Sequence, residues 1–347
     1  NGTARARLVA CGYSQVAGVD FTNVFSPVAN DVSFRIMIIC MILWNLEALI
    51  FDVETAFLNG ELEEEIYMDC PKGMEHEPDE CLLLTKSMYG LVQAARQYFK
   101  KFENILTKKM GFKQCGSDPC LFMRKNEFGL VIVLCYVDDN LCIGNRKALD
   151  QVLKEIVQHG LNITVENELT DYLSCEIRFN EDRTKAWIGQ PHMVKKLEKT
   201  FGAEVTGLQK YKTPGTPGQG LIRAKIEEDK ITKEQQSRYR TGVGMLLYLI
   251  KHSRPDICNA VRELTKCLDG ATPVAYKEMT RVIKHVLDTK NRGLKVDPTA
   301  TSLEWDLLVY SDSDWAGDKD DRKSVSGYMI FLNGVLICWR SKSQQSV

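Results

Sequence analysis

The sequence lacks several features that would assign a protein to a class at once. Its longest apolar run, residues 36–44, is far shorter than the roughly 20 residues that a membrane-spanning helix needs. The 12 cysteines include no Cys-x-x-Cys pair, and no histidine accompanies them at the spacing of zinc ligands. These absences exclude a membrane segment and a cysteine-based zinc site. We interpret the cysteines as reduced, mostly buried thiols of a protein that is not secreted.

The two ends of the chain also lack expected features. The first residue is Asn1 rather than Met, no signal peptide is evident, and the last residues, SKSQQSV, contain no closing element. We therefore expect the chain to be an internal piece of a longer polypeptide.

The composition is that of a folded protein with unevenly distributed charge. At 347 residues and 44% hydrophobic content, the chain can bury a substantial core, and its length favours two or three domains. Residues 47–80 contain 12 Asp and Glu against one Lys, net −11, whereas residues 183–292 contain 22 Lys and Arg against 11 Asp and Glu, net +11. The basic excess is typical of a polyanion-binding surface, although solvated helix faces would give the same count.

Hydrophobic spacing predicts both helices and strands along the chain. We expect short buried strands at 49–53 and 130–136, and helices at 33–46, 87–109, 146–157, 235–250, 256–267 and 274–287. A Pro/Gly linker, residues 212–220, precedes the last three helices. From residue 303 we expect a strand, an acidic loop, and a hairpin that turns at Asn333 and Gly334.

Two adjacent carboxylates, Asp138 and Asp139, interrupt the apolar stretch 130–144. We expect a hairpin here, with the turn at Asp139 and Asn140, because both residue types tolerate positive φ, and with residues 141–144 as the return strand. Such a turn lets both carboxylates approach one space, whereas a regular strand would send them to opposite faces. An ordinary polar turn remains an alternative.

Asp52 ends the other short apolar strand, in the segment IFDVETAFLNG. Three carboxylates at adjacent strand ends would form an oxygen-rich site suited to Mg²⁺. Two such ions can activate an attacking hydroxyl and stabilise a leaving phosphate oxygen. The sequence leaves the meeting of Asp52 with Asp138 open, because 86 residues separate them.

An ordered set of motifs covers essentially the whole chain. They are ARLVACGYSQVAGVDFTNVFSPV (6–28), FDVETAFLNGELEEEIYM (51–68), YGLVQAARQYF (89–99), YVDD (136–139), SRPDICNAV (253–261) and YSDSDWAGDKDDRKSVSGYMIFLNG (310–334). In this order and spacing, the chain resembles the reverse transcriptase of copia-type LTR retrotransposons, as a fragment of the Pol polyprotein.

The resemblance implies an α+β fold, a right-hand polymerase with fingers, a palm with an antiparallel sheet and a helical thumb, followed by a truncated α/β ribonuclease H-like domain. It implies fingers and palm in residues 1–200, with the palm at about 47–70 and 126–200. Residues 201–300 would form a linker and a basic helical thumb or connection. Residues 301–347 would be the incomplete N-terminal part of the ribonuclease H domain.

The resemblance also implies an RNA-directed DNA polymerase that transfers dNTPs onto a primer 3′-hydroxyl by a two-metal mechanism. Mg²⁺ is the expected cofactor, with Mn²⁺ as a substitute, and the partners are an RNA template, a DNA primer or hybrid, and dNTPs. Asp52, Asp138 and Asp139 take the catalytic and metal-binding positions. The expected location is the cytoplasm, within a virus-like particle, or the nucleus.

Further positions carry over for the incoming nucleotide: Ala56, Phe57, Gly90, Gln93, Arg7 and Arg5. Phe57 matches an aromatic steric gate that would clash with a 2′-hydroxyl, although a simple core role remains open. Gly90 and Gln93 match a motif near the nascent base pair and template. Arg5 and Arg7 match basic residues that contact the triphosphate, and the resemblance does not choose between them.

The C-terminal motif matches only the start of a ribonuclease H domain. Asp312 matches the first carboxylate of that site, but the chain stops before the others, so we do not expect this piece to cleave RNA. Asp314, Asp318, Asp320 and Asp321 are interpreted as loop acids.

Two residues depart from the family pattern, and two other functions stay open. Val92 stands where Lys is usual, and Ser174 where Gly is common.

One alternative is a decayed or co-opted copy that binds nucleic acid without catalysis. Another is a two-metal nuclease built on Asp52 and Asp138, which would leave the Phe57 spacing and the basic region unexplained.

Overall fold

The computed structural model describes residues 6–299, 304–318 and 320–345. The chain divides into two compact units. The first holds the described residues up to Met37 together with Asn45–Leu169, and the second holds Ile38–Trp44 together with the described residues from Thr170 on. Helix α1 (Asp31–Leu43) contributes to both units. Within the described ranges, no helix has the length and apolar character needed to cross a membrane.

The first unit is built on a six-stranded antiparallel sheet. Its strand order is β4-β5-β6-β7-β1-β8, with β4 (Lys113–Gln114), β5 (Leu121–Asn126), β6 (Gly129–Tyr136), β7 (Asp139–Gly144), β1 (Glu47–Val53) and β8 (Ile163–Glu166). The central strands β6, β7 and β1 are almost entirely buried, which explains their continuous Val, Leu and Ile content. The predicted strands 49–53 and 130–136 are confirmed.

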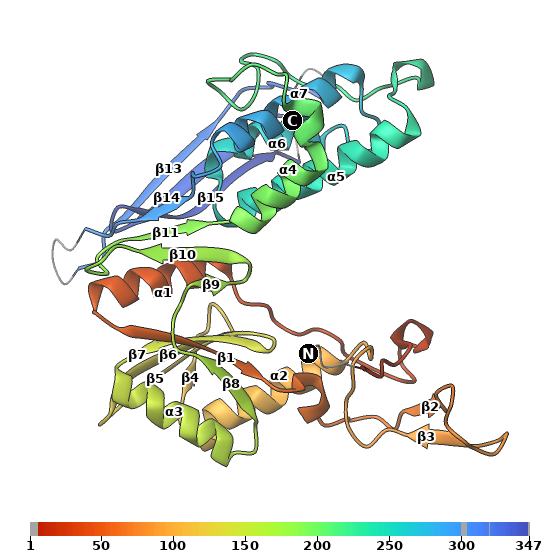
Figure 1. Ribbon diagram of the computed structural model, residues 1–347, viewed down its shortest axis with the longest axis vertical. Helices are drawn as coiled ribbons and strands as arrows, with labels where there is room; N and C mark the ends of the chain where they lie inside the picture. The colour runs from red at the N-terminus through yellow and green to blue at the C-terminus, as the bar shows by residue number, and fades with distance from the viewer. Residues whose placement is uncertain (1–5, 300–303, 319, 346–347) are drawn as a thin grey trace. The chain divides into compact units, whose positions relative to one another are not determined.

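Two helices lie on the lower side of this sheet in Figure 1, α2 (Ala94–Asn104) and α3 (Arg146–Gln158). The predicted helix 87–109 begins later than expected, because Gly90 has φ +95° and cannot continue a right-handed helix. After α2 the chain continues as a π-helical turn, Ile105–Lys109.

A smaller part of the first unit lies outside the six-stranded sheet. It contains the hairpin of β2 (Tyr67–Asp69) and β3 (Cys81–Leu83) and the 3₁₀ helices Gly12–Ser14 and Ala56–Asn59. A small cluster of buried residues, Ala10, Ile66, Met88, Leu91 and Ala94, holds these pieces together with the half-buried Phe57. The N-terminal segment is therefore packed onto the start of α2.

In the second unit, a four-stranded antiparallel sheet runs in the order β12-β11-β10-β9. Its strands are β9 (Asp171–Tyr172), β10 (Cys175–Phe179), β11 (Ala186–Gly189) and β12 (Leu294–Val296). Leu173 and Ser174 form the two-residue turn between β9 and β10, with φ of 52° and 61°. Ser174 therefore occupies a left-handed position that glycine adopts at lower cost.

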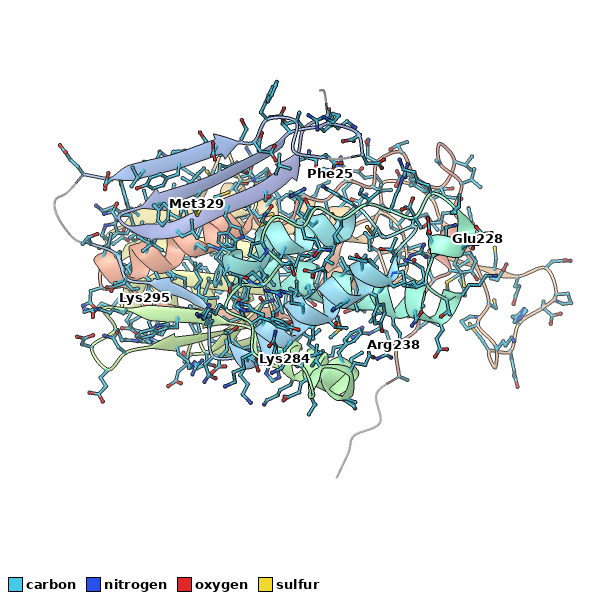
Figure 2. All side chains as sticks on the ribbon, turned by 90° about the horizontal axis from the view of Figure 1, so that it is seen from above. Phe25, Glu228, Arg238, Lys284, Lys295 and Met329 are labelled. Carbon is cyan, nitrogen blue, oxygen red and sulfur yellow. The ribbon has the colours of Figure 1, made fainter. Side chains whose placement is uncertain are left out.

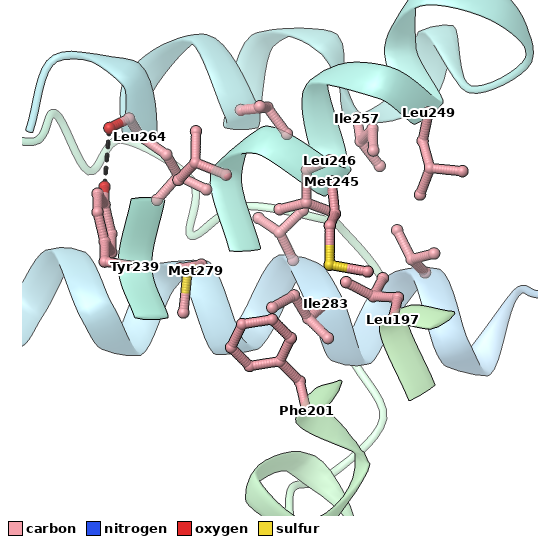
Figure 3. Packing of buried hydrophobic residues seen from close by; sticks show 14 of the residues in the cluster. Leu197, Phe201, Tyr239, Met245, Leu246, Leu249, Ile257, Leu264, Met279 and Ile283 are labelled. Carbon is pink, nitrogen blue, oxygen red and sulfur yellow. Dashed lines mark hydrogen bonds between the residues drawn. The ribbon is translucent and has the colours of Figure 1, made fainter. Parts of the chain in front are cut away.

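Four helices form the main core of the second unit: α4 (Pro191–Val205), α5 (Lys233–His252), α6 (Cys258–Thr265) and α7 (Pro273–Asp288). Figure 3 shows Phe201 of α4 packed beside Met279 and Ile283 of α7, and the Tyr239 hydroxyl donating to the Leu264 carbonyl at 2.8 Å. The three predicted helices after the linker are confirmed. The middle one starts with a 3₁₀ turn, Pro255–Ile257, and a further 3₁₀ helix spans Glu227–Asp229.

A three-stranded antiparallel sheet completes the second unit, with β13 (Leu307–Ser313), β14 (Val325–Leu332) and β15 (Val335–Ser343). The predicted hairpin turn is confirmed, because Asn333 and Gly334 join β14 to β15 with φ of 47° and 79°. Residues of β13 are exposed along its whole length.

Candidate active site

The three acidic residues that the sequence singled out lie at one end of the first unit's sheet. Asp52 of β1 pairs with Asp139 of β7, and the Val53 amide donates to the Asp138 carbonyl at 3.2 Å. Backbone pairing thus joins Asp52 directly to a residue 87 positions further along the chain. The meeting that the sequence left open takes place.

The turn that carries Asp138 differs from the expected one. Tyr136 pairs directly with Asp139, so the turn consists of Val137 and Asp138, and Val137 rather than Asp139 or Asn140 has positive φ, at 58°. The prediction of the turn at Asp139 and Asn140 is wrong, because pairing with β1 holds both in extended conformation. A β-branched residue in this conformation costs of order 1–3 kcal/mol, which surrounding contacts must offset.

Asn140 lies on the buried side of this strand end. Side chains alternate along a strand, so Asp52 and Asp139 share one face of the sheet, whereas Phe51 and Asn140 share the other. The Asn140 side chain is fully buried, and its Nδ2 donates to the Asp138 carbonyl at 2.7 Å and to the Phe51 carbonyl at 3.4 Å. One amide therefore bridges the two backbone segments that carry the acids.

The remaining polar atoms beneath the acids are also buried. Asn140 Oδ1 has no hydrogen-bond partner among the residues that the structure describes, and the nearby Tyr98 hydroxyl forms no well-aligned hydrogen bond there. Burial raises the pKa of Tyr98 well above its usual range, and the charge of Asp138 adds to this effect. The layer under the carboxylates is therefore uncharged and tightly packed.

The carboxylates influence one another electrostatically. Burial raises the pKa of Asp52, and the negative charges of Asp138 and Glu54 raise it further. Burial likewise raises the pKa of Asp139, followed by the charges of Asp138 and Asp52. Asp138 is the neighbour that acts on both, and a cation placed among these groups would stabilise their ionised forms.

These residues fit a hard divalent cation. Across the described ranges, no three His, Cys, Asp or Glu side chains are arranged as a complete ligand set. Mg²⁺ does not need one, because it is usually held by one or two carboxylates together with water and substrate phosphates. Two mutually repelling carboxylates on rigid strand ends meet that requirement.

The predicted steric gate lies in the segment that follows β1. Ala56 is buried and Phe57 is half-buried in the 3₁₀ helix Ala56–Asn59. The Phe57 ring meets the Tyr89 ring edge-on, with centroids 5.1 Å apart, and the Arg7 guanidinium lies 4.4 Å from the Tyr89 centroid. The structure thus brings Phe57 and Arg7 to the same tyrosine. Arg5 lies outside the described residues.

Gly90 and Gln93 tie the N-terminal segment to α2. A Cβ added at Gly90 would lie 2.1 Å from the Ala10 carbonyl oxygen, so only glycine permits this approach. Gln93 is fully buried, accepts from Gln15 Nε2 at 3.1 Å, and donates to the Asp20 carbonyl at 3.0 Å. In this structure the Gln93 amide is engaged within the chain. Val92 is exposed, and its N–H donates to the Gln15 side chain.

Asp312 lies in the second unit, exposed on β13, and lines a hollow of about 620 Å³ between the three-stranded sheet and α6. The acids after it have local partners. Asp314 accepts from the Val325 amide, Asp318 pairs with Lys266 at 2.6 Å, and Asp320 pairs with Lys225 at 2.7 Å. These contacts agree with the interpretation of the later acids as loop residues.

Sequence reasoning placed Asn140 in the hairpin turn and assigned no role to Tyr98, and it predicted neither side chain beneath the acids. A signal existed for the first, since an amide inside an apolar strand must find a buried partner. Nothing in the spacing of Tyr98 distinguishes it from an ordinary core residue on α2.

Comparisons with known proteins agree with the motif pattern. The family model described as reverse transcriptase (RNA-dependent DNA polymerase) matches residues 1–216. The chain is 31% identical to the retrovirus-related Pol polyprotein from transposon TNT 1-94 of Nicotiana tabacum and 32% identical to that from transposon RE1 of Arabidopsis thaliana. Each match covers 99% of this chain but only 26% and 23% of those proteins, so the chain spans about a quarter of their length.

A shorter relative is matched over most of its length. The putative transposon Ty5-1 protein of Saccharomyces cerevisiae is 27% identical over 85% of this chain and 93% of the yeast protein. With the family model matching more than half of the residues, the chain belongs to the reverse transcriptase (RNA-dependent DNA polymerase) family, and the predicted resemblance to copia-type retrotransposon Pol polyproteins is confirmed.

Proposed function

We propose that this chain is an RNA-directed DNA polymerase that adds dNTPs to a primer 3′-hydroxyl on an RNA or DNA template. The observation that carries the proposal is the convergence of Asp52, Asp138 and Asp139 at the paired ends of β1 and β7. Family membership supports the same reaction. The chemistry is that of a copia-type retrotransposon enzyme within a longer polyprotein.

Mg²⁺, or Mn²⁺ in its place, would supply activation of the primer hydroxyl and stabilisation of the leaving phosphate oxygen. Asp52 and Asp138 are the proposed ligands, and Asp139 is the adjacent acid. The chain's own contribution is rigidity. The buried strands fix both carboxylates, and the Asn140 amide fixes the two backbones relative to each other.

The proposed nucleotide pocket includes Ala56, Phe57, Gly90, Gln93 and Arg7, with Arg5 as a candidate outside the described residues. Phe57 would exclude a 2′-hydroxyl, and its contact with Tyr89 would hold the ring in place. Arg7 would meet the triphosphate. For Gln93, the internal hydrogen bonds support a role in holding the N-terminal segment, through which it would act on the substrate indirectly.

The proposed architecture assigns fingers and palm to residues 1–200, a basic thumb or connection to 201–300, and a ribonuclease H-like part to 301–347. RNA template, DNA primer and dNTPs are the proposed partners, and a virus-like particle in the cytoplasm, or the nucleus, the proposed location.

Primer extension on a homopolymer RNA template with Mg²⁺ or Mn²⁺ tests the catalytic assignment. Asp138→Asn should abolish incorporation, whereas Asp69→Asn, which removes an exposed acid on β2, should leave it unchanged. Equal incorporation by wild type and Asp138→Asn would refute the assignment. Template binding without incorporation by the wild type would favour a co-opted copy that binds nucleic acid without catalysis.

Sugar selectivity tests the steric gate separately. Phe57→Ala should raise rNTP incorporation relative to dNTP, while Phe128→Ala, at an exposed ring in the β5–β6 turn, should not. Unchanged selectivity in Phe57→Ala would return this ring to a purely structural role.

A further inference from the structure

A hollow on the second unit combines cationic side chains with an exposed indole. It encloses about 430 Å³ where the loop after α7 passes the end of β11. Arg178, Trp187, Lys290 and Arg292 line it, and no acid is among the described lining residues. A Cβ at Gly293 would lie 2.4 Å from the Ile188 carbonyl oxygen, so the loop runs directly against the strand.

The indole belongs to a row of side chains that crosses the outer face of the four-stranded sheet. Arg178 of β10 pairs with Trp187 of β11, which pairs with Lys295 of β12. Their strand neighbours Ile177 and Ile188 are buried, so alternation places the row on the outer face. Figure 2 labels Lys295 on this sheet. Trp187 keeps 39% of its surface exposed, which leaves the indole available to a ligand.

The positive charges at the hollow are only partly neutralised. Arg178 lies 3.3 Å from Glu176, and its side chain is 63% exposed. Arg292 lies 3.9 Å from Asp256, but Arg254 already holds that carboxylate with two hydrogen bonds of 2.8 Å. Lys295, in the same row, is paired with Asp297 at 2.6 Å.

Lys290 adds a charge without a counterpart. It forms no ion pair within 4.0 Å among the described residues, and it lines the hollow beside Arg292. Two cations next to each other without a dedicated acid attract an anion. Phosphate groups therefore suit the side of the hollow that Lys290 and Arg292 line.

We infer that this hollow, defined by Arg178, Trp187, Lys290 and Arg292, holds a segment of single-stranded nucleic acid. A base would stack on the Trp187 indole, and the adjoining phosphates would lie against Lys290 and Arg292. An unpaired strand is required, because the bases of a duplex are stacked inside it and offer no free face. The choice of ligand rests on the proposed polymerase function, which brings template strands to this chain.

Fluorescence anisotropy with a labelled 20-nucleotide oligo(dT) tests the inference without metal or dNTPs. Trp187→Ala should weaken binding by about tenfold, and Trp187→Phe should restore most of it. Lys290→Gln combined with Arg292→Gln should weaken binding and reduce the slope of log affinity against log salt by about 1.4, at roughly 0.7 per phosphate contact. The matched controls are Trp315→Ala, at an exposed tryptophan, and Lys108→Gln with Lys109→Gln.

Each outcome decides between named alternatives. Wild-type affinity in Trp187→Ala and in the double variant overturns the inference, even if the wild type extends primers. If Trp187→Ala weakens binding of a blunt duplex as much as binding of oligo(dT), the hollow attracts charge without stacking a base. The same conclusion follows if inorganic polyphosphate competes equally well with oligo(dT) for the wild type and for Trp187→Ala. Either result overturns the base-binding role of Trp187. If the variants weaken oligo(dT) binding but the wild type extends no primer, the inference about the hollow is supported and only the polymerase proposal is refuted.

Discussion

Replacing Asn140 by leucine should separate positioning of the carboxylates from stability of the fold. Losing the 2.7 Å hydrogen bond to the Asp138 carbonyl costs about 0.5–1.5 kcal/mol, and the longer bond to Phe51 contributes less. The substitution also removes Oδ1, a buried acceptor without a partner in the described residues, which recovers about 1 kcal/mol or more. The Asp138 carbonyl keeps its bond from the Val53 amide. We therefore expect a net change within about 1 kcal/mol of the wild-type free energy of unfolding.

Activity should respond far more strongly than stability. Without the amide, the turn that holds Asp138 is connected to β1 only through strand pairing, and a displacement near 1 Å at a catalytic group can cost about 100-fold in rate. We expect primer extension to fall at least tenfold and its midpoint in Mg²⁺ concentration to rise. The thermal midpoint should shift by no more than about 4 °C.

The assay compares extension across a Mg²⁺ titration with thermal unfolding in the same buffer, and isothermal titration with Mn²⁺ measures metal binding directly. Cys142→Ala is the matched control, because Cys142 is fully buried two residues further along the same side of β7 and has no role at the acids. If Asn140→Leu retains the wild-type rate, Mg²⁺ midpoint and Mn²⁺ affinity, the bridging role of the amide is refuted. A parallel loss in Cys142→Ala would assign the effect to general destabilisation.

Two further predictions concern stability alone. Ser174→Gly should raise the free energy of unfolding by about 1 kcal/mol, because Ser174 has φ 61° and glycine adopts this conformation without a Cβ clash. Chemical denaturation measures this change, and an unchanged or lower free energy of unfolding would contradict this account of the turn. Asp139→Asn should raise the thermal midpoint in metal-free buffer near neutral pH, because burial and the charges of Asp138 and Asp52 raise the pKa of Asp139. A raised carboxyl pKa means that folding opposes ionisation of Asp139. The gain in thermal midpoint should therefore disappear below about pH 4, where this carboxyl is protonated in the unfolded chain as well as in the folded one. A gain that persists at pH 3 would point to another cause.

Much of the fold followed from local pattern. The Val, Leu and Ile runs at 49–53 and 130–136 predicted buried strands, and period-3.6 spacing predicted α3, α5 and α7. The Asn333–Gly334 dipeptide predicted the β14–β15 turn, since both residues tolerate positive φ. These elements were predictable because each depends on interactions between residues close together in the sequence.

Other features depended on distant contacts. The start of α2 was misplaced because Gly90 takes φ +95° to let Ala10 approach, and the sequence near Gly90 does not reveal that partner. The hairpin turn was misplaced by pairing with β1, which holds Asp139 and Asn140 extended and leaves the positive φ to Val137.

By itself, the sequence determined the family and the segregated charge and singled out the three acids as candidates, because ordered motifs and composition need no spatial information. Only the tertiary structure decided that Asp52 stands beside Asp138 and Asp139 and that Asn140 bridges their backbones. The reason is physical: strand register across 86 intervening residues is fixed by burial of both strands' apolar side chains together, and that packing exists only in the folded chain.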